Sequence, residues 1–283
     1  MPCNRRDFFK QIAAVPALAL AVPANNDDPL GVLVDTTLCV GCRKCEEACN
    51  KINEELPRQS PKSFEDQTVF AKRRRMDAGT FTVVNRYGNV FAKFQCMHCL
   101  QPACVSACIV GALSKEANGA VTYDSWKCIG CRYCMVACPF QVPAYEYHNA
   151  LTPKVRKCIF CFEKRLAKGE TPACVSACPM QVMTFGKRTD LIRQGETKIR
   201  ENPDRYVQHL YGRDEVGGTA WMYLSSVPFD KIDLPTLGYH PVPGFTEPVQ
   251  HLLFKWFLPP LALYAALAFV MRRQQQETPD AHA

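Results

Sequence analysis

Sixteen of the seventeen cysteines in this 283-residue chain fall into four groups of four. The first and third groups have the spacing C-x2-C-x2-C-x3-C, while the second widens one gap to four residues and the fourth widens one gap to twelve. Three closely spaced thiolates and a fourth that reaches a neighbouring cluster are the ligands of paired [4Fe-4S] clusters. The spacing therefore predicts four such clusters. The groups are Cys39, Cys42, Cys45, Cys49; Cys96, Cys99, Cys104, Cys108; Cys128, Cys131, Cys134, Cys138; and Cys158, Cys161, Cys174, Cys178.

Zinc and disulfides are the two alternatives for so many cysteines. Structural zinc uses two C-x2-C pairs per ion and gives no role to a third and fourth cysteine at these spacings. Cysteines three residues apart on one turn make poor disulfides, and 283 residues can form a core without covalent cross-links. Both alternatives are therefore less favoured than the clusters. Cys3 lies outside every group, and we expect it to be removed with an N-terminal signal.

The order of the groups predicts which cysteines share a cluster. In a two-cluster module the fourth cysteine of each motif binds the neighbouring cluster. The second and third motifs are adjacent and must pair, which leaves the first to pair with the fourth. The predicted ligand sets are Cys39, Cys42, Cys45 and Cys178 (site 1); Cys158, Cys161, Cys174 and Cys49 (site 2); Cys96, Cys99, Cys104 and Cys138 (site 3); and Cys128, Cys131, Cys134 and Cys108 (site 4).

The elements around these motifs predict an α+β fold of two nested double-cluster, ferredoxin-like modules. We expect strands at 31–34, 120–123, 183–185 and 219–225, a hairpin across 81–94 that turns near Gly88, and a short helix at 189–200. The predicted domains are a four-cluster domain at 25–188 with an insertion at 50–95, and a wrapping segment and linker at 189–250.

The formal charge of +7 counts every cysteine as neutral. Sixteen thiolates around four cluster cores of about +2 add roughly −8, so the loaded protein is near neutral, at about −1. The basic residues are then better explained as balancing cluster charge than as binding nucleic acid. The one dense basic run, Lys72 to Arg75, has no interleaved aromatic residues and is interpreted as a solvated loop.

Both ends of the chain carry localisation signals. Arg5 and Arg6 precede Phe8-Phe9-Lys10 and an apolar run, so residues 1–24 are predicted to be a twin-arginine export signal. This route exports folded protein, so clusters built under reducing conditions would survive an oxidising destination.

The apolar run from Leu252 to Met271 predicts a transmembrane helix over 251–273, followed by a cytoplasmic tail at 274–283. The flanking residues Lys255, Trp256, Arg272 and Arg273 predict its orientation. The expected location is the periplasmic side of the cytoplasmic membrane, anchored by this single helix with the N-terminus outside and the C-terminus inside. The alternative for this run is an amphipathic or packed helix.

Several motifs resemble those of a known family. They are LCVGC at 38–42, QCMHC and CVSAC at 95–108, CIGCRYCMVACPF at 128–140, and PACVSACP at 172–179. They are similar to the four-cluster electron-transfer subunits of the dimethyl-sulfoxide-reductase type. The segments 211–219 and 226–235 and the C-terminal helix resemble the exported, membrane-anchored iron–sulfur subunit of hydrogenase-2-like [NiFe] hydrogenases. The β subunit of formate dehydrogenase is similar over much of the same span.

No catalytic site is evident in the sequence. His98, between two predicted ligands, is expected to hydrogen-bond to cluster sulfur or to pack, and Glu46 and Glu47 are expected to be solvated. A further set of apolar residues is expected to keep water from the sulfurs: Ile129, Met135, Val136, Phe140, Ile159 and Phe160.

Four clusters without an active site predict an electron relay. The resemblance implies one between an exported catalytic subunit, hydrogenase-like or a molybdenum or tungsten enzyme such as formate dehydrogenase, and a quinone-reactive integral membrane subunit. The alternative is a freestanding, membrane-anchored polyferredoxin that exchanges electrons with diffusing partners. A zinc-dependent structural or nucleic-acid-binding protein is a third class.

Overall fold

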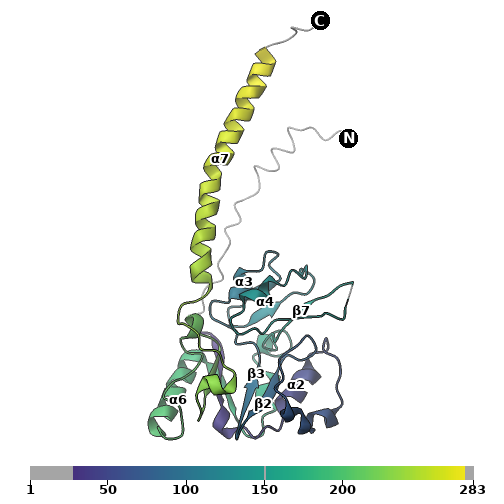
Figure 1. Ribbon diagram of the computed structural model, residues 1–283, viewed down its shortest axis with the longest axis vertical. Coiled ribbons are helices and arrows are strands. Elements are labelled where there is room, and N and C mark those ends of the chain that lie inside the picture. The colour runs from purple at the N-terminus through teal and green to yellow at the C-terminus, as the bar shows by residue number, and fades with distance from the viewer. Residues whose placement is uncertain (1–27, 150, 278–283) are drawn as a thin grey trace.

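A mixed three-stranded sheet joins the two ends of the cysteine-rich region. In the computed structural model, which describes residues 28–149 and 151–277, β1 (Leu30–Asp35) lies between β8 (Met183–Lys187) and β9 (Trp221–Leu224). β1 is antiparallel to β8 and parallel to β9. Because β1 precedes the first cysteine motif and β8 follows the fourth, this pairing brings the two outer motifs together (Figure 1).

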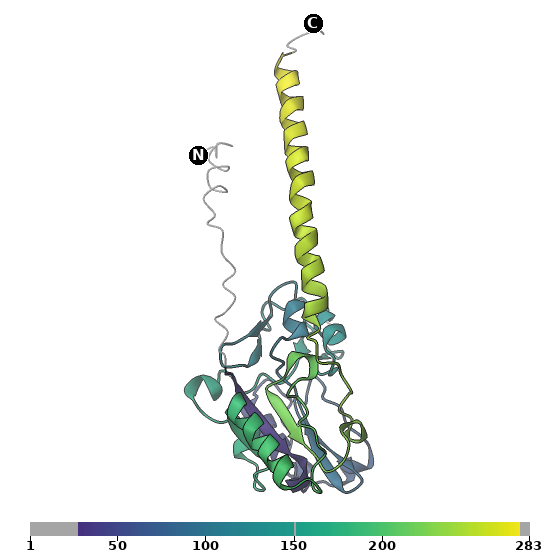
Figure 2. The same ribbon diagram turned by 90° about the vertical axis from the view of Figure 1, so that its left-hand side faces the viewer.

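Side chains on the two faces of β1 enter different parts of the core. Successive strand residues point to opposite faces, so Leu33 faces one side, and Val32 and Val34 face the other. Leu33 packs with Leu191 of α6 (Arg188–Glu201), which lies along the sheet (Figure 2). Val32 and Val34 join the larger core that contains several of the cysteines. The sheet therefore separates a purely apolar layer from the cysteine-rich one.

A hairpin covers the region between the first and second motifs. It consists of β2 (Val83–Tyr87) and β3 (Val90–Phe94), paired antiparallel, with Gly88 in the left-handed region at φ 61°. The glycine is suited to this turn because it has no Cβ to clash at positive φ. Both strands contribute buried residues to the core.

The four cysteine motifs form two packed pairs of short helices. α2 (Lys44–Ile52) of the first motif packs against α5 (Ala173–Ser176) of the fourth. α3 (Ala103–Ser106) of the second packs against α4 (Tyr133–Ala137) of the third. The remaining short elements are β4 (Leu113–Lys115), β5 (Val121–Tyr123), β6 (Ala144–Tyr145), β7 (Val155–Arg156) and 3-10 turns at Thr36–Leu38, Pro61–Phe64, Thr68–Ala71, Leu166–Lys168, Glu215–Gly217 and Phe229–Ile232.

The strands and the helix expected from the sequence are confirmed. They correspond to β1, β5, β8, β9, the β2–β3 hairpin and α6. Small sheets and short helices of this kind are consistent with the ferredoxin-like part of the predicted α+β fold. The predicted export signal at 1–24, with Arg5 and Arg6, lies outside the described residues, as does most of the 274–283 tail.

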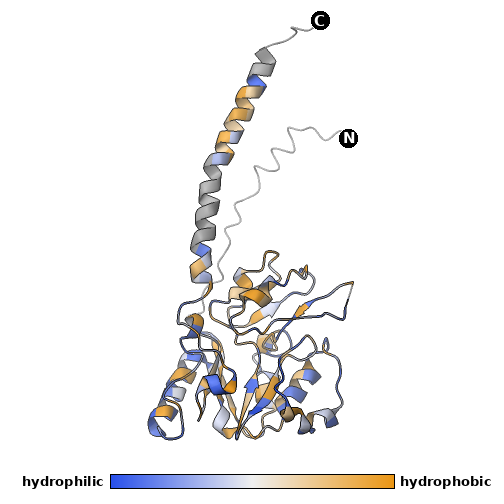
Figure 3. Ribbon diagram, viewed as in Figure 1, coloured by the Kyte–Doolittle hydropathy of each residue, from blue (hydrophilic) through white to orange (hydrophobic). Residues whose placement is uncertain are grey.

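The prediction of a transmembrane helix over 251–273 is wrong. α7 (Pro243–Glu277) is a long helix that leaves the body beside α3 (Figures 1 and 3). Within the described residues, however, no helix is both long and apolar enough to cross a membrane. The sequence offers a physical reason. Lys255 and Arg272 leave sixteen residues between them, about 24 Å of helix against roughly 30 Å of hydrocarbon.

The predicted location is wrong as well, because it relied on that helix. The periplasmic placement with the N-terminus outside and the C-terminus inside relied on this anchor and on its flanks Lys255, Trp256, Arg272 and Arg273. These residues belong to α7, for which no span is found.

Replacing Leu33 by alanine tests the packing between the sheet and α6. Leu33 is almost fully buried against Leu191, Met222 and Leu224. The L33A protein should lose about 2–5 kcal/mol of stability because a cavity replaces the side chain. The measurement is the urea-unfolding midpoint by circular dichroism, with L151A as the control because Leu151 is exposed. Equal midpoints for the two variants would contradict this packing.

Candidate functional site

In each cysteine motif, the residue immediately before the second cysteine has a left-handed conformation. These residues are Gly41, His98, Gly130 and Phe160, with φ between 47° and 72°. The backbone N–H of Gly130 donates to Cys128 Sγ, and that of Phe160 to Cys158 Sγ, each at 3.4 Å. The left-handed turn thus directs a backbone donor at a thiol. Hydrogen bonds to cluster sulfurs are one means by which proteins set cluster potentials.

At two of these positions the left-handed residue is not glycine. A left-handed conformation costs a residue with a Cβ about 1–2 kcal/mol, so it persists only where packing supports it. His98 and Phe160 are both almost fully buried, and their rings stack with centroids 4.7 Å apart. This stack joins the second motif to the fourth.

The cysteines of site 1 line one pocket, and the cysteines of site 2 line another. Cys178 comes from the fourth motif and lies in the same pocket as the first three cysteines of the first motif, Cys39, Cys42 and Cys45. Cys49, the last cysteine of the first motif, lines a second pocket with Cys158, Cys161 and Cys174. The fold thus brings together the cysteines of the first and fourth motifs in two mixed sets.

The second and third motifs are mixed in the same way. Burial raises the pKa of Cys99 well above its ordinary value, and the neighbouring thiolates of Cys96, Cys138 and Cys104 raise it further. Burial raises the pKa of Cys134 to about 11, with added contributions from Cys108, Cys128 and Cys131. Cys138 therefore lies with the first three cysteines of the second motif, and Cys108 with those of the third.

Burial governs the ionisation of these thiols. It raises the pKa of Cys39 and of Cys161 to about 11, and that of Cys104 to about 12. A thiolate is costly to bury because its charge loses hydration. The metal-free thiols are therefore protonated at neutral pH, and metal binding must displace these protons because the thiolate is the ligand.

Interactions between the sets place the four sites in a row. Besides burial, the nearby Cys174 of site 2 raises the pKa of Cys45 of site 1, and the nearby Cys96 of site 3 raises the pKa of Cys158 of site 2. Cys104 of site 3 in turn lies close to Cys134 of site 4. The spatial order 1–2–3–4 differs from the order of the motifs along the chain.

Buried donors without protein partners lie beside these sites. Trp221 Nε1 has no hydrogen-bond partner and its side chain lines the pocket of site 2. His98 Nδ1 accepts a hydrogen bond from the Val121 N–H at 2.9 Å, and burial holds the pKa of His98 well below its usual range. The proton of the neutral ring is therefore on Nε2, which is also buried and unpartnered. Such donors fit a group that carries acceptor sulfurs, as an iron–sulfur cluster does.

The arrangement fits the alternatives less well. The sixteen cysteines of the four motifs are free thiols in the part of the chain that the structure describes. Across those same residues, no three His, Cys, Asp or Glu side chains converge tightly enough to bind a single metal ion. The four thiols of site 1 instead line one pocket together, and the four thiols of site 2 line another, as the ligands of a cluster would.

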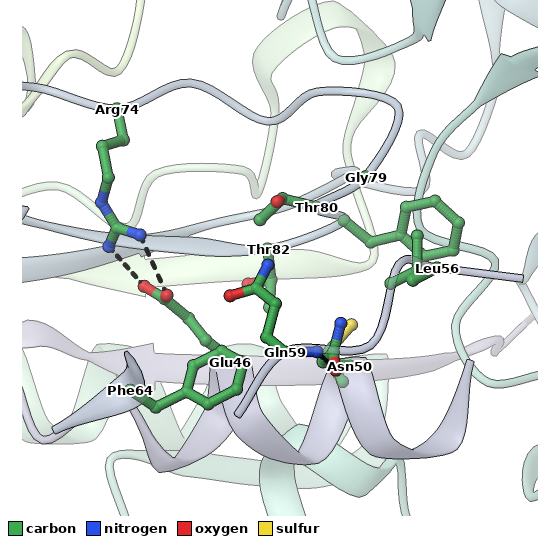
Figure 4. A pocket seen from close by; sticks show the side chains of 11 residues that line it. Glu46, Asn50, Leu56, Gln59, Phe64, Arg74, Gly79, Thr80 and Thr82 are labelled. Carbon is green, nitrogen blue, oxygen red and sulfur yellow. Dashed lines mark hydrogen bonds and ion pairs between the residues drawn. The ribbon is translucent and has the colours of Figure 1, made fainter. Parts of the chain in front are cut away.

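The expectation that Glu46 is solvated is wrong. Glu46 is buried and forms an ion pair with Arg43 at 2.9 Å. A second ion pair joins it to Arg74 at 2.6 Å (Figure 4). It also accepts a hydrogen bond from the Val84 N–H at 2.6 Å. Arg74 therefore does not belong to a solvated basic loop. Arg43 lies beside Cys42 in the loop of site 1, so this network connects that loop to the β2–β3 hairpin.

The apolar residues expected to shield the sulfurs differ in burial, and Met135, Phe140 and Ile159 are half-buried. Phe160 is buried, whereas Ile129 and Val136 are 62% and 87% exposed. Both exposed residues lie in the third motif, near site 4. Ile109, Trp126 and Tyr133 are also exposed. The shielding predicted for Ile129 and Val136 is absent within this chain, and the rim of site 4 is an exposed apolar surface.

Lys93 was missed by the sequence analysis. It lies on β3, is buried, and lines the pockets of both site 1 and site 2. Its neighbours Gln95 and Trp221 line the pocket of site 2. No sequence signal distinguishes Lys93 from a surface lysine, because both faces of β3 are covered and the alternation of polar and apolar residues carries no information there.

Comparisons with known proteins give consistent results. A family model described as a 4Fe-4S dicluster domain matches residues 88–188. A protein of Nitratidesulfovibrio vulgaris is 49% identical over 259 residues, which cover 88% of this chain and 68% of that protein. Hydrogenase-2 operon protein HybA of Escherichia coli O157:H7 is 35% identical, with 95% of each chain covered. The iron–sulfur subunit of the nitrate-inducible formate dehydrogenase of Escherichia coli K12 is 32% identical, covering 83% of this chain and 80% of that one. The resemblance based on the cysteine motifs is confirmed.

Glu46 can be tested against its neighbour Glu47. Removing the Glu46 carboxylate leaves the buried Arg43 and the largely buried Arg74 without their partner, so E46A should cost about 3–5 kcal/mol. Glu47 forms a more exposed pair with Lys44, so E47A should cost about 0–1 kcal/mol. Urea-unfolding midpoints of the two loaded proteins provide the comparison. Similar losses in both would show that the network does not stabilise the fold.

Proposed function

The chain belongs to the family of iron–sulfur electron-transfer subunits that includes those of formate dehydrogenase, and we propose that it relays electrons through four [4Fe-4S] clusters. In this proposal a catalytic oxidoreductase subunit lies at one end of the relay and a quinone-reactive membrane subunit at the other. The clusters supply the one-electron chemistry. The protein fixes their positions, excludes water from them and tunes their potentials.

The row of four mixed cysteine sets carries this proposal. Each set supplies the four thiolates that a [4Fe-4S] cluster requires. The neighbours along the row are linked through the pairs Cys45–Cys174, Cys158–Cys96 and Cys104–Cys134. A continuous row provides an entry site, an exit site and two internal sites joined by three transfer steps, which is what a relay between two partners needs.

The two ends of the row approach the surface. Site 4 includes the exposed Cys131, and site 1 is flanked by the half-exposed Val40 and Met180. By contrast, Cys96 and Cys104 of site 3 and Cys161 and Cys174 of site 2 are buried. Electrons can therefore enter and leave at sites 1 and 4, while the inner sites are shielded.

Exposed apolar surface favours fixed partners over diffusing ones. The rim of site 4 exposes Trp126 and Val136, and α7 exposes Leu261, Tyr264 and Phe269. Apolar surfaces of this kind usually mark a protein interface. α7 begins next to α3, and Ser106 Oγ of α3 donates to Glu247 at 2.9 Å. A partner that covers α7 would thus adjoin sites 3 and 4.

Iron analysis and purification test the proposal. Anaerobically isolated protein should contain about sixteen irons and sixteen sulfides per chain, since each cluster holds four of each. Isolation in mild detergent should recover a large catalytic chain and a polytopic membrane chain with it. A loaded but solitary chain would exclude the fixed relay and favour a diffusing carrier. A protein that contains zinc and essentially no iron would exclude both.

Cys138 and Cys108 test the exchange of fourth ligands. C138S should disturb the cluster at site 3, so its electron paramagnetic resonance spectrum should match that of C99S, a variant of site 3 itself. C108S should instead match C131S of site 4. The spectra are compared in dithionite-reduced, full-length protein. If C138S matches C131S, then each motif binds its own cluster and the predicted exchange is wrong.

A further inference from the structure

Lys93 lies between sites 1 and 2. Its side chain is 3% exposed and lines both pockets. Its Nζ donates to Gln95 Oε1 at 2.5 Å and lies 4.4 Å from the centroid of the Trp221 ring. Gln95 Nε2 donates to Tyr223 Oη, which in turn donates to the backbone oxygen of Lys93. The ammonium is therefore fixed in place and does not reach solvent.

A buried ammonium needs a negative partner. Burying a charge costs several kcal/mol unless an opposite charge compensates. Among residues 28–149 and 151–277, no carboxylate forms an ion pair with Lys93; its polar neighbours are the neutral Gln95 amide and the aromatic Trp221. The cysteines of both pockets surround it instead, Cys45 at site 1 and Cys158 and Cys174 at site 2, and these would carry negative charge as cluster ligands.

We propose that the Lys93 ammonium is the shared counter-ion of the clusters at sites 1 and 2 and raises the reduction potential of both. This inference rests on the proposed clusters. A [4Fe-4S] core with four thiolates carries a charge of about −2, and one electron from the neighbouring cluster takes it to about −3. A fixed positive charge stabilises the more negative state more strongly. Reduction at both sites is therefore favoured.

The same geometry distinguishes this pair of sites from the other. Lys115 is a counterpart at site 3, where its Nζ donates to the backbone oxygen of Cys99 at 2.8 Å and to that of Gly119 at 2.7 Å. Burial lowers the pKa of Lys115 to about 8. It lies on β4, away from the pockets of sites 1 and 2. Lys115 is thus a matched position for a control substitution.

The test compares K93M and K93R with K115M in full-length, iron-loaded protein. Potentials are measured by redox titration followed by electron paramagnetic resonance, and signals are assigned with C42S for site 1 and C161S for site 2. K93M should lower the reduction equilibrium constant at both sites at least tenfold, which is 59 mV for one electron. K93R should restore it. K115M should leave sites 1 and 2 unchanged.

Each outcome bears on the proposal. Wild-type potentials at sites 1 and 2 in loaded K93M would overturn it, and so would an equal shift at all four sites. If K93M does not bind iron, the proposal requires that K93R does and that K93Q does not. If K93R also loses its iron, the shape of the side chain at position 93 matters and its charge does not, and this result would also overturn the proposal. An iron-free wild-type protein would instead overturn the proposed function.

Discussion

The cost of burying thiolate charge is the constraint on which this structure depends. Burial, with a smaller contribution from neighbouring cysteines, raises the pKa of Cys39, Cys104 and Cys134, so these side chains favour the neutral thiol unless a metal binds them. Loaded clusters would place negative charge in the same interior. The fold places fixed hydrogen-bond donors and one cation around the sulfurs. The donors are the backbone N–H groups in the left-handed turns and the ring N–H groups of Trp221 and His98, and the cation is Lys93.

Positioning those groups requires segments that are distant in the sequence. Lys93 comes from the hairpin, Trp221 from β9, and the thiols around them from the first and fourth motifs. The β8–β1–β9 sheet and its contact with α6 hold these segments in register. The Glu46 network adds a second tie between the first motif and the hairpin. The sheet therefore positions sites 1 and 2, although it contributes no cysteine.

The cysteine spacing, the strands and α6 could be predicted from the sequence because each has a local signature. The role of Lys93 and the burial of Glu46 could not, since both depend on partners that are distant in the chain. The transmembrane helix was predicted from an apolar run that was treated as continuous although it contains the charged Lys255. Shielding by Ile129 and Val136 was inferred from their place beside the cysteines, but both side chains are exposed, Val136 on α4 and Ile129 in the loop before it.

The pairing of β1 with β9 has a consequence for how the protein is made. Val34, near the start of the described chain, finds its partner Tyr223 almost two hundred residues later. Cys39 likewise shares its pocket with Cys178. Contacts of such long sequence separation form slowly. Sites 1 and 2 can be completed only after the ribosome has released most of the polypeptide, whereas sites 3 and 4 can close on a nascent fragment. Cofactor insertion would then proceed from the end of the row at site 4 towards site 1.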